Sequence, residues 1–90
     1  MSHFVYILHS KKLDKFYVGK SSNPLRRLEY HNSSDNRIWS KRGQPWQLKR
    51  VIEFENSHAA SNAEVFIKRQ KSRKFIESLI KSGWKVSDPD

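Results

Sequence analysis

The sequence predicts an α+β domain with three β-strands and three or more helices. Three runs rich in β-branched and aromatic residues, at 3–9, 16–20 and 47–54, have the composition of strands. Between the second and third runs, and again after the third, apolar residues recur with the period of a helix. A chain of 90 residues makes one small domain, so we expect it to span residues 1–84, with residues 85–90 as a C-terminal tail.

The first two strands are expected to pair as a hairpin, because only the polar segment 10–15 separates them. The third strand is expected to begin near Trp46 and to end at Phe54. Its alternation of apolar and polar residues breaks at Arg50 and Val51, which predicts a β-bulge at that point.

Asn23 and Pro24 predict the start of the first helix, since asparagine is a good N-cap and proline fits the first helical position. Leu25 and Leu28 of this helix are expected to face the sheet. The polar segment that follows has its loosest part at 32–36 and a short helical turn predicted near Arg37 to Lys41.

Asn56 or Ser57 can cap the helix that follows the third strand. Its expected inner stripe consists of Ala60, Ala63, Phe66, Ile67 and Gln70. A second apolar pattern follows at Phe75, Ile76, Leu79 and Ile80. The two patterns differ in phase near 70–73, which indicates a break between two helices. Gly83 suits the end of the second one, and Trp84 is expected to fold back onto the core.

The charge of the chain is strongly positive, with 18 Lys and Arg against 9 Asp and Glu and a formal charge of +9. This excess predicts a polyanionic partner, with nucleic acid first and an acidic membrane surface a distant second. The absence of cysteine excludes disulfides, thiolate metal sites and cysteine nucleophiles. No stretch approaches the ~20 apolar residues of a membrane span, and no secretory signal pattern is present. We therefore expect a cytoplasmic protein with no membrane partner.

Two tyrosines, Tyr6 and Tyr17, lie in the first two predicted strands. Taken alone, such a pair indicates aromatic core residues, because aromatics are enriched in strands. Here Tyr17 precedes Gly19 and Lys20, which would put bare backbone and a cation at one edge of the sheet, where a phosphate could approach. The segment lacks the glycines and the spacing of a P-loop, so nucleoside triphosphate binding is not expected.

Arg27 and His31 lie four positions apart on the first predicted helix and therefore share a neighbouring face. Each of them alone would be an ordinary surface or structural residue. Together they offer a guanidinium fork for phosphate oxygens and a group that can move a proton near neutral pH without tuning.

Glu64 has two interpretations. Its spacing from Lys68 predicts a surface ion pair of small energy. Its place beside the inner stripe also suits a carboxylate that holds one hard cation such as Mg²⁺, with water and substrate phosphate as further ligands. The chain has no zinc-type ligand set, so zinc catalysis is not expected.

These residues, taken in order, resemble the GIY-YIG nuclease family over nearly the whole chain. Its first motif matches Phe4-Val5-Tyr6, with Phe4 in place of the glycine, and its second matches Tyr17-Val18-Gly19, followed by Lys20 as in the N-terminal nuclease domain of the excision-repair excinuclease. The helix arginine matches Arg27, the His-or-Tyr position matches His31, and the late glutamate matches Glu64. The chain is most similar to the small stand-alone bacterial group related to that excinuclease domain.

The resemblance implies a three-stranded antiparallel sheet flanked by helices, and metal-dependent endonuclease cleavage of DNA in repair, recombination or processing. Glu64 would hold one Mg²⁺ or Mn²⁺. Either Tyr6 or Tyr17 would activate the attacking water, with His31 assisting, and Arg27 would stabilise the charge on the phosphate. Lys20 would lower the pKa of the neighbouring phenol. We also assign three residues to substrate binding: Gly19, Lys20 and Lys68.

Relatives in this family usually find their target through an appended DNA-binding domain, which the sequence does not show. We therefore expect weak DNA binding with little sequence preference, or a targeting protein partner. The alternative function is a non-catalytic nucleic-acid-binding module on the same fold.

Overall fold

The computed structural model describes residues 2–84, and within them it has three strands, three α-helices and one 3-10 helix. In chain order these are β1 (His3–Ser10), β2 (Lys15–Ser21), α1 (Pro24–His31), the 3-10 helix η1 (Trp39–Gly43), β3 (Trp46–Phe54), α2 (Ser57–Gln70) and α3 (Arg73–Ser82). The tail predicted at 85–90 lies outside the described residues. The α+β architecture is confirmed, and the turn expected near 37–41 is η1, two residues further along the chain.

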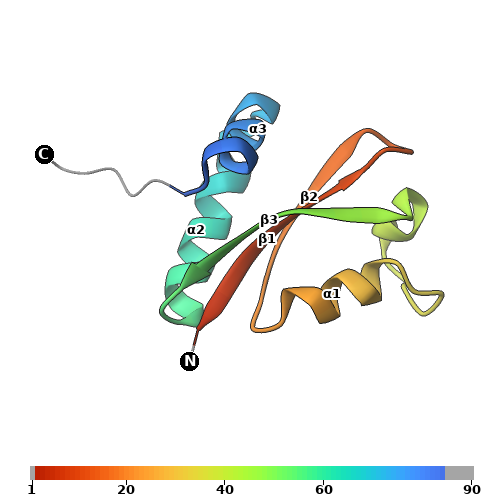
Figure 1. Ribbon diagram of the computed structural model, residues 1–90, viewed down its shortest axis with the longest axis horizontal. Coiled ribbons are helices and arrows are strands. Elements are labelled where there is room, and N and C mark those ends of the chain that lie inside the picture. The colour runs from red at the N-terminus through yellow and green to blue at the C-terminus, as the bar shows by residue number, and fades with distance from the viewer. Residues whose placement is uncertain (1, 85–90) are drawn as a thin grey trace, which may run out of the picture.

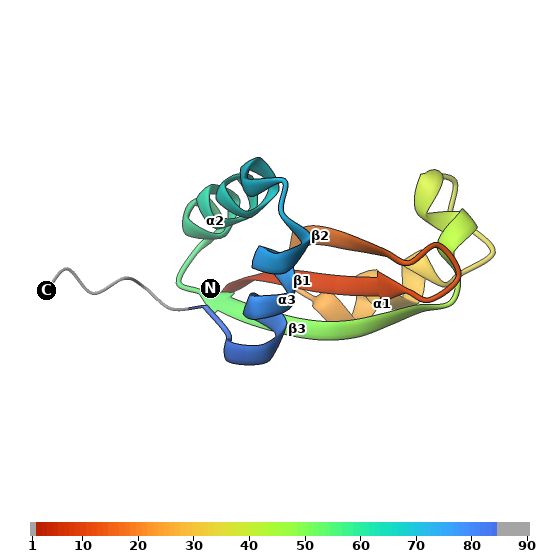
Figure 2. The ribbon, with the colours of Figure 1, turned by 90° about the horizontal axis from the view of Figure 1, so that it is seen from above.

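The three strands form one antiparallel sheet in the order β2-β1-β3, so the first strand of the chain is the central one (Figure 2). Tyr6 lies opposite Gly19 of β2 and opposite Val51 of β3. The register between β1 and β3 shifts at Lys49, because Ile7 pairs with Arg50 whereas Leu8 pairs with Leu48. The predicted bulge is therefore present, one residue before the expected position.

Helices cover both faces of the sheet, with α2 and α3 on one side and α1 on the other (Figure 1). On the first face, β1 contributes Val5 and Ile7 to a core completed by buried residues of β2, α2 and α3: Val18, Ala60, Ala63, Ile67 and Leu79. On the second face, β1 contributes Tyr6 and Leu8, which pack with Trp46, Tyr17, Leu28 and Leu48. Because the two faces alternate along a strand, four consecutive residues of β1 are buried.

Short polar side chains begin each α-helix, as the sequence indicates. Asn23 accepts a hydrogen bond from the Arg26 backbone N–H at 3.2 Å, and Asn56 accepts one from Ala59 at 2.9 Å. The predicted break between the last two helices is confirmed at Lys71, whose left-handed backbone (φ 46°) ends α2. No helix within residues 2–84 is both long and apolar enough to cross a membrane.

Two details of the predicted helix faces are wrong. Leu25 is 64% exposed instead of facing the sheet, because the inward face of α1 follows the spacing of Pro24, Leu28 and His31. Phe66 is 50% exposed, and Gln70 is exposed as well, since the buried stripe of α2 consists only of Ala60, Ala63 and Ile67. Trp84 folds back as expected and packs edge-on against Phe54 at 5.7 Å between ring centroids.

Candidate functional site

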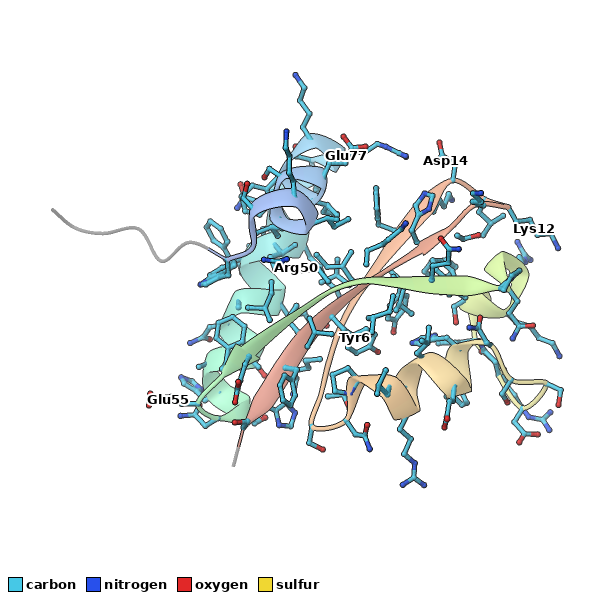
Figure 3. The ribbon with its side chains drawn as sticks, in the orientation of Figure 1. Tyr6, Lys12, Asp14, Arg50, Glu55 and Glu77 are labelled. Carbon is cyan, nitrogen blue, oxygen red and sulfur yellow. The ribbon has the colours of Figure 1, made fainter. Side chains whose placement is uncertain are left out.

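The site is built around the phenol of Tyr6, which projects from the middle of the central strand toward α1 (Figure 3). The Tyr6 hydroxyl lies 3.2 Å from Nε2 of His31, the last residue of α1. The pKa of Tyr6 is raised overall, because burial and the charges of Tyr17 and Glu64 outweigh the lowering by the neighbouring Arg27 guanidinium. Side chains from β2, α1 and α2 therefore act on this one phenol of β1.

Gly19 makes room for that phenol. A Cβ atom at position 19 would lie 2.6 Å from the Tyr6 hydroxyl oxygen and 2.7 Å from the ring carbon that bears it. Gly19 is buried opposite Tyr6 in the strand ladder, so its lack of a side chain has a steric reason. A contact between its backbone and a phosphate stays a prediction.

His31 is fully buried at the start of a chain of polar contacts. Its Nδ1 lies 2.9 Å from the Ser40 hydroxyl of η1. Burial, together with the charge of Arg27, lowers the pKa of His31 to about 4. The expectation that this imidazole gains and loses a proton near neutral pH without tuning is therefore wrong, because the ring is neutral there.

Arg27 completes the α1 side of the site. It is four residues before His31, and its guanidinium also lies over the Tyr30 ring, 4.9 Å from the centroid. Contact with Tyr6 raises the pKa of Arg27, so this residue is a fixed positive charge beside the phenol.

Tyr17 of β2 is less deeply buried than Tyr6 and His31 and forms the more exposed side of the site. Its ring stacks on that of Tyr6 at 6.2 Å with an angle of 22° between the planes, and it lies 4.4 Å from the His31 ring. On its outer side stands Trp39 of η1, at 5.8 Å and 50% exposed. Both predicted tyrosines are thus in one aromatic cluster with His31.

Glu64 of α2 forms the ion pair that its spacing predicts, with 2.8 Å between its Oε2 and Lys68 Nζ. The Glu64 side chain is 17% exposed and that of Lys68 55%. An exposed i,i+4 pair contributes only about 0.3–0.5 kcal/mol, so Lys68 does not commit this carboxylate to a structural role.

A hard divalent cation fits Glu64 only as a site with a single protein carboxylate. Oxygen ligands suit Mg²⁺ and Mn²⁺, and the carboxylate is near enough to Tyr6 to raise its pKa. Among residues 2–84, no three His, Cys, Asp or Glu side chains gather within reach of one ion. An ion held there would take its other ligands from water and substrate.

Lys20 does not lie beside the phenols, contrary to what the sequence suggests. It pairs with Val5 in the ladder, so it faces the α2 side of the sheet while Tyr6 and Tyr17 face α1. The cation that lowers the pKa of Tyr6 is Arg27, and the expectation that Lys20 acts on the neighbouring phenol is wrong. Lys20 is exposed on the side of Glu64, where its binding to substrate stays a prediction.

A hollow of about 460 Å³ opens along β2 beside this cluster. Its aromatic wall is formed by Phe16, Tyr17 and Trp39. Its rim carries four cations: Lys15, Lys68, Lys71 and Arg73. Asp14 and Glu77 pair with Arg73.

Sequence reasoning missed Asn36 and Ser40. The segment 32–36 is not the loosest part of the connector, because Asn36 is 1% exposed and Ser40 is fully buried. The Asn36 amide donates to the backbone carbonyl of His31 at 3.0 Å and to the Ser40 hydroxyl at 2.8 Å. A polar loop has no periodic pattern that would have marked these two residues.

The family model of the GIY-YIG catalytic domain matches residues 2–76. The chain belongs to the GIY-YIG family. The match confirms the resemblance that was inferred from the ordered motifs. It places this GIY-YIG protein in a nuclease family.

The relatives of this GIY-YIG chain include short and long proteins. The UPF0213 protein YsiG of Lactococcus lactis is 33% identical over 81 residues, covering 89% of this chain and 76% of that protein. The structure-specific endonuclease subunit SLX1 homolog of Leishmania infantum is 39% identical over 71 residues, covering 69% of this chain and 10% of that protein. This chain likewise spans 23% of the structure-specific endonuclease subunit slx1 of Pyrenophora tritici-repentis.

The fold of this GIY-YIG chain is also that of a solved relative. The solution NMR structure of a UPF0213 protein from Bacillus halodurans aligns with a TM-score of 0.56 and 28% identity, covering 90% of this chain and 84% of that chain. The three-stranded antiparallel sheet flanked by helices is thereby confirmed.

Proposed function

We propose that this GIY-YIG protein is a divalent-metal-dependent endonuclease that hydrolyses DNA phosphodiester bonds with little sequence preference, in repair, recombination or processing. The observation that carries the proposal is the hydrogen-bonded Tyr6 phenol, which lies between His31 and Arg27 and within electrostatic reach of Glu64. A core tyrosine has no need of a guanidinium and a carboxylate around it.

We assign the role of general base to Tyr6, because it is the phenol on which both His31 and Arg27 act. Tyr6 acts in its phenolate form, which it reaches by giving its proton to solvent. The phenolate takes a proton from the attacking water as the water oxygen bonds to phosphorus. The bond from phosphorus to the leaving oxygen breaks, and that oxygen takes a proton from solvent. Arg27 stabilises the negative charge that develops on the phosphate. His31 assists by holding the Tyr6 oxygen in place.

Glu64 would hold one Mg²⁺ or Mn²⁺, and the bound ion would polarise the phosphate and make water a better nucleophile. Lys20 and Lys68 lie on the same side of the sheet as Glu64 and would bind the phosphates on either side of the cut. The cations around the β2 hollow would hold the backbone of the DNA strand without reading its sequence.

A protein partner is proposed for targeting. The described residues contain no second domain that could read a sequence, and phosphate contacts alone give affinity without specificity. The names of the long relatives describe them as subunits of a structure-specific endonuclease.

Plasmid nicking in the presence of Mg²⁺ or Mn²⁺ tests the proposal. We expect the parent to nick supercoiled DNA, and both Glu64→Gln and Arg27→Ala to reduce the rate by about a hundredfold or more. Glu77→Gln is the matched control, because Glu77 also forms an exposed i,i+4 ion pair, with Arg73 on α3. Equal rates for the parent and both site variants would refute the site. DNA binding without cleavage of duplex, branched or single-stranded DNA would favour the non-catalytic binding module.

A further inference from the structure

The buried contacts of His31 determine which of its nitrogens carries the proton. They begin at Asn36, whose amide orientation is fixed by the backbone. Its oxygen accepts the N–H of Ile38 at 2.9 Å, so its nitrogen is the atom that faces the His31 carbonyl and the Ser40 hydroxyl. Asn36 is therefore a donor to Ser40 and cannot be an acceptor from it.

The direction of this bond decides the next one. The Ser40 hydroxyl accepts from Asn36 and has one proton of its own to donate. Within residues 2–84, its other hydrogen-bonding neighbour is Nδ1 of His31, at 2.9 Å. Ser40 is fully buried, so a hydroxyl proton without an acceptor would be costly. Ser40 must donate to Nδ1, and the ring proton then lies on Nε2.

We propose that Asn36 and Ser40 are positioning residues that hold His31 in the Nε2–H tautomer, so that His31 donates a hydrogen bond to the Tyr6 oxygen. The ring is neutral at neutral pH, because burial lowers the pKa of His31 to about 4, and its single proton can occupy one nitrogen or the other. In this arrangement His31 cannot take the proton of Tyr6.

The consequence for catalysis rests on the proposed function. A phenolate at Tyr6 would accept a hydrogen bond from His31 Nε2–H and would lie beside the positive charge of Arg27. Both interactions favour the ionised form of Tyr6. With the proton on Nδ1, the bare Nε2 would face the phenolate and disfavour it. The segment that carries Asn36 and η1 would thus set the strength of the base without touching it, through two successive hydrogen bonds.

Long-range ¹H–¹⁵N correlation spectra of the ¹⁵N-labelled full chain at neutral pH test the tautomer directly, since the protonated and bare ring nitrogens resonate far apart. We expect a protonated Nε2 in the parent. In Asn36→Asp a carboxylate oxygen would accept the Ser40 proton, Ser40 would then accept from His31 Nδ1–H, and the tautomer should reverse. Asn62→Asp is the matched control, because Asn62 contacts the exposed His58 on α2, and the His31 signals should not change.

A protonated Nδ1 in the parent, or the same tautomer in parent and Asn36→Asp, would overturn the proposal. If Asn36→Asp does not fold by circular dichroism, Ser40→Ala replaces it and should release the fixed tautomer, whereas Ser40→Thr, which keeps the hydroxyl, should restore it. In the nicking assay, Ser40→Ala should lower kcat by about tenfold or more with little change in KM. A parent with Nε2–H that cuts no DNA would refute the proposed function and leave the tautomer assigned.

Discussion

At the scale of single residues, the site depends on side chains that are buried and polar at once. His31, Ser40 and Asn36 are each at most 1% exposed, and every one of them has a hydrogen-bond partner. His31 stabilises the fold only in its neutral form, because an added charge in the interior has no solvent to stabilise it. The geometry of the site and the stability of the domain are therefore linked through His31.

Acid should destabilise the domain through His31. Its pKa is about 4 in the folded chain and 6.5 as a free side chain, so below pH 6.5 the unfolded chain binds a proton that the folded chain does not. Stability is fully present above that pH and falls as the pH drops toward 4. At about 1.4 kcal/mol per pH unit, the loss from His31 is roughly 3 kcal/mol. Urea unfolding between pH 7 and pH 4 measures it.

The control for this prediction is His31→Gln, which cannot titrate. Its free energy of unfolding starts lower, but it should decline less steeply with acid than that of the parent. If the two curves run parallel, the titration of His31 does not contribute to the loss of stability in acid.

Gly19 should tolerate no side chain. Gly19→Ala would push a methyl group into the Tyr6 ring and hydroxyl, and a core overpacked in this way loses about 1–3 kcal/mol. Lys20→Ala, one residue along the same strand but exposed on the other face, should change the free energy of unfolding by less than about 0.5 kcal/mol. Equal stabilities of the two variants in urea would contradict the steric account.

At the scale of elements, the parts that were predictable are those with a pattern. The hairpin, the caps at Asn23 and Asn56 and the break near Lys71 all follow from alternation, from helical period or from capping chemistry. Leu25 and Phe66 were placed wrongly, because an apolar residue at the margin of a helical stripe can belong to either side. Only the crossing of helix and sheet decides which side is buried.

Apart from the helical turn that corresponds to η1, the order of the connector 32–45 could not be predicted, because it comes from single contacts. The Gln44 amide donates to the carbonyls of His31 and Ser33, both at 2.8 Å, and the Asn32 amide donates to the Trp46 carbonyl at 3.0 Å. For the same reason the sequence indicated Tyr6, Tyr17, Arg27 and Glu64 through their motif, but not the loop residues behind His31.

The domain should become more stable when the backbone strain at the junction of α2 and α3 is removed. Lys71 has a left-handed backbone that glycine adopts without cost, so Lys71→Gly should raise the free energy of unfolding by about 0.5–1 kcal/mol. Lys74→Gly, inside the first turn of α3, should lower it by about as much. Thermal unfolding of both variants measures the difference, and a loss at both positions would refute the assignment of Lys71 as a C-cap.

At the scale of the whole molecule, the charge of +9 should govern encounter with DNA. Cations release counterions from the duplex when they bind phosphates, so affinity should fall linearly with salt on logarithmic axes. Glu64→Gln should retain this binding, because it removes a ligand for metal and no cation for phosphate.

The β2 hollow predicts where the duplex lies. Lys71→Ala, on the rim of the hollow, should reduce the salt slope by about one. Lys81→Ala, in the last turn of α3 and not on that rim, is the control with the same loss of charge and should leave the slope closer to that of the parent. Fluorescence anisotropy at several salt concentrations measures both. Identical slopes for the two variants would refute this path for the DNA.

The central place of β1 also has a consequence for how the chain is made. β1 leaves the ribosome before the elements that it pairs with, since His3 pairs with Phe54 and each face of β1 is covered by helices that are synthesised later. Four consecutive apolar and aromatic residues, Val5 to Leu8, thus lack a complete core until β3 and the helices after it have been synthesised. Contacts so distant in sequence slow the search for the native state. The same strand that presents the phenol to the site is therefore open to aggregation in the nascent chain.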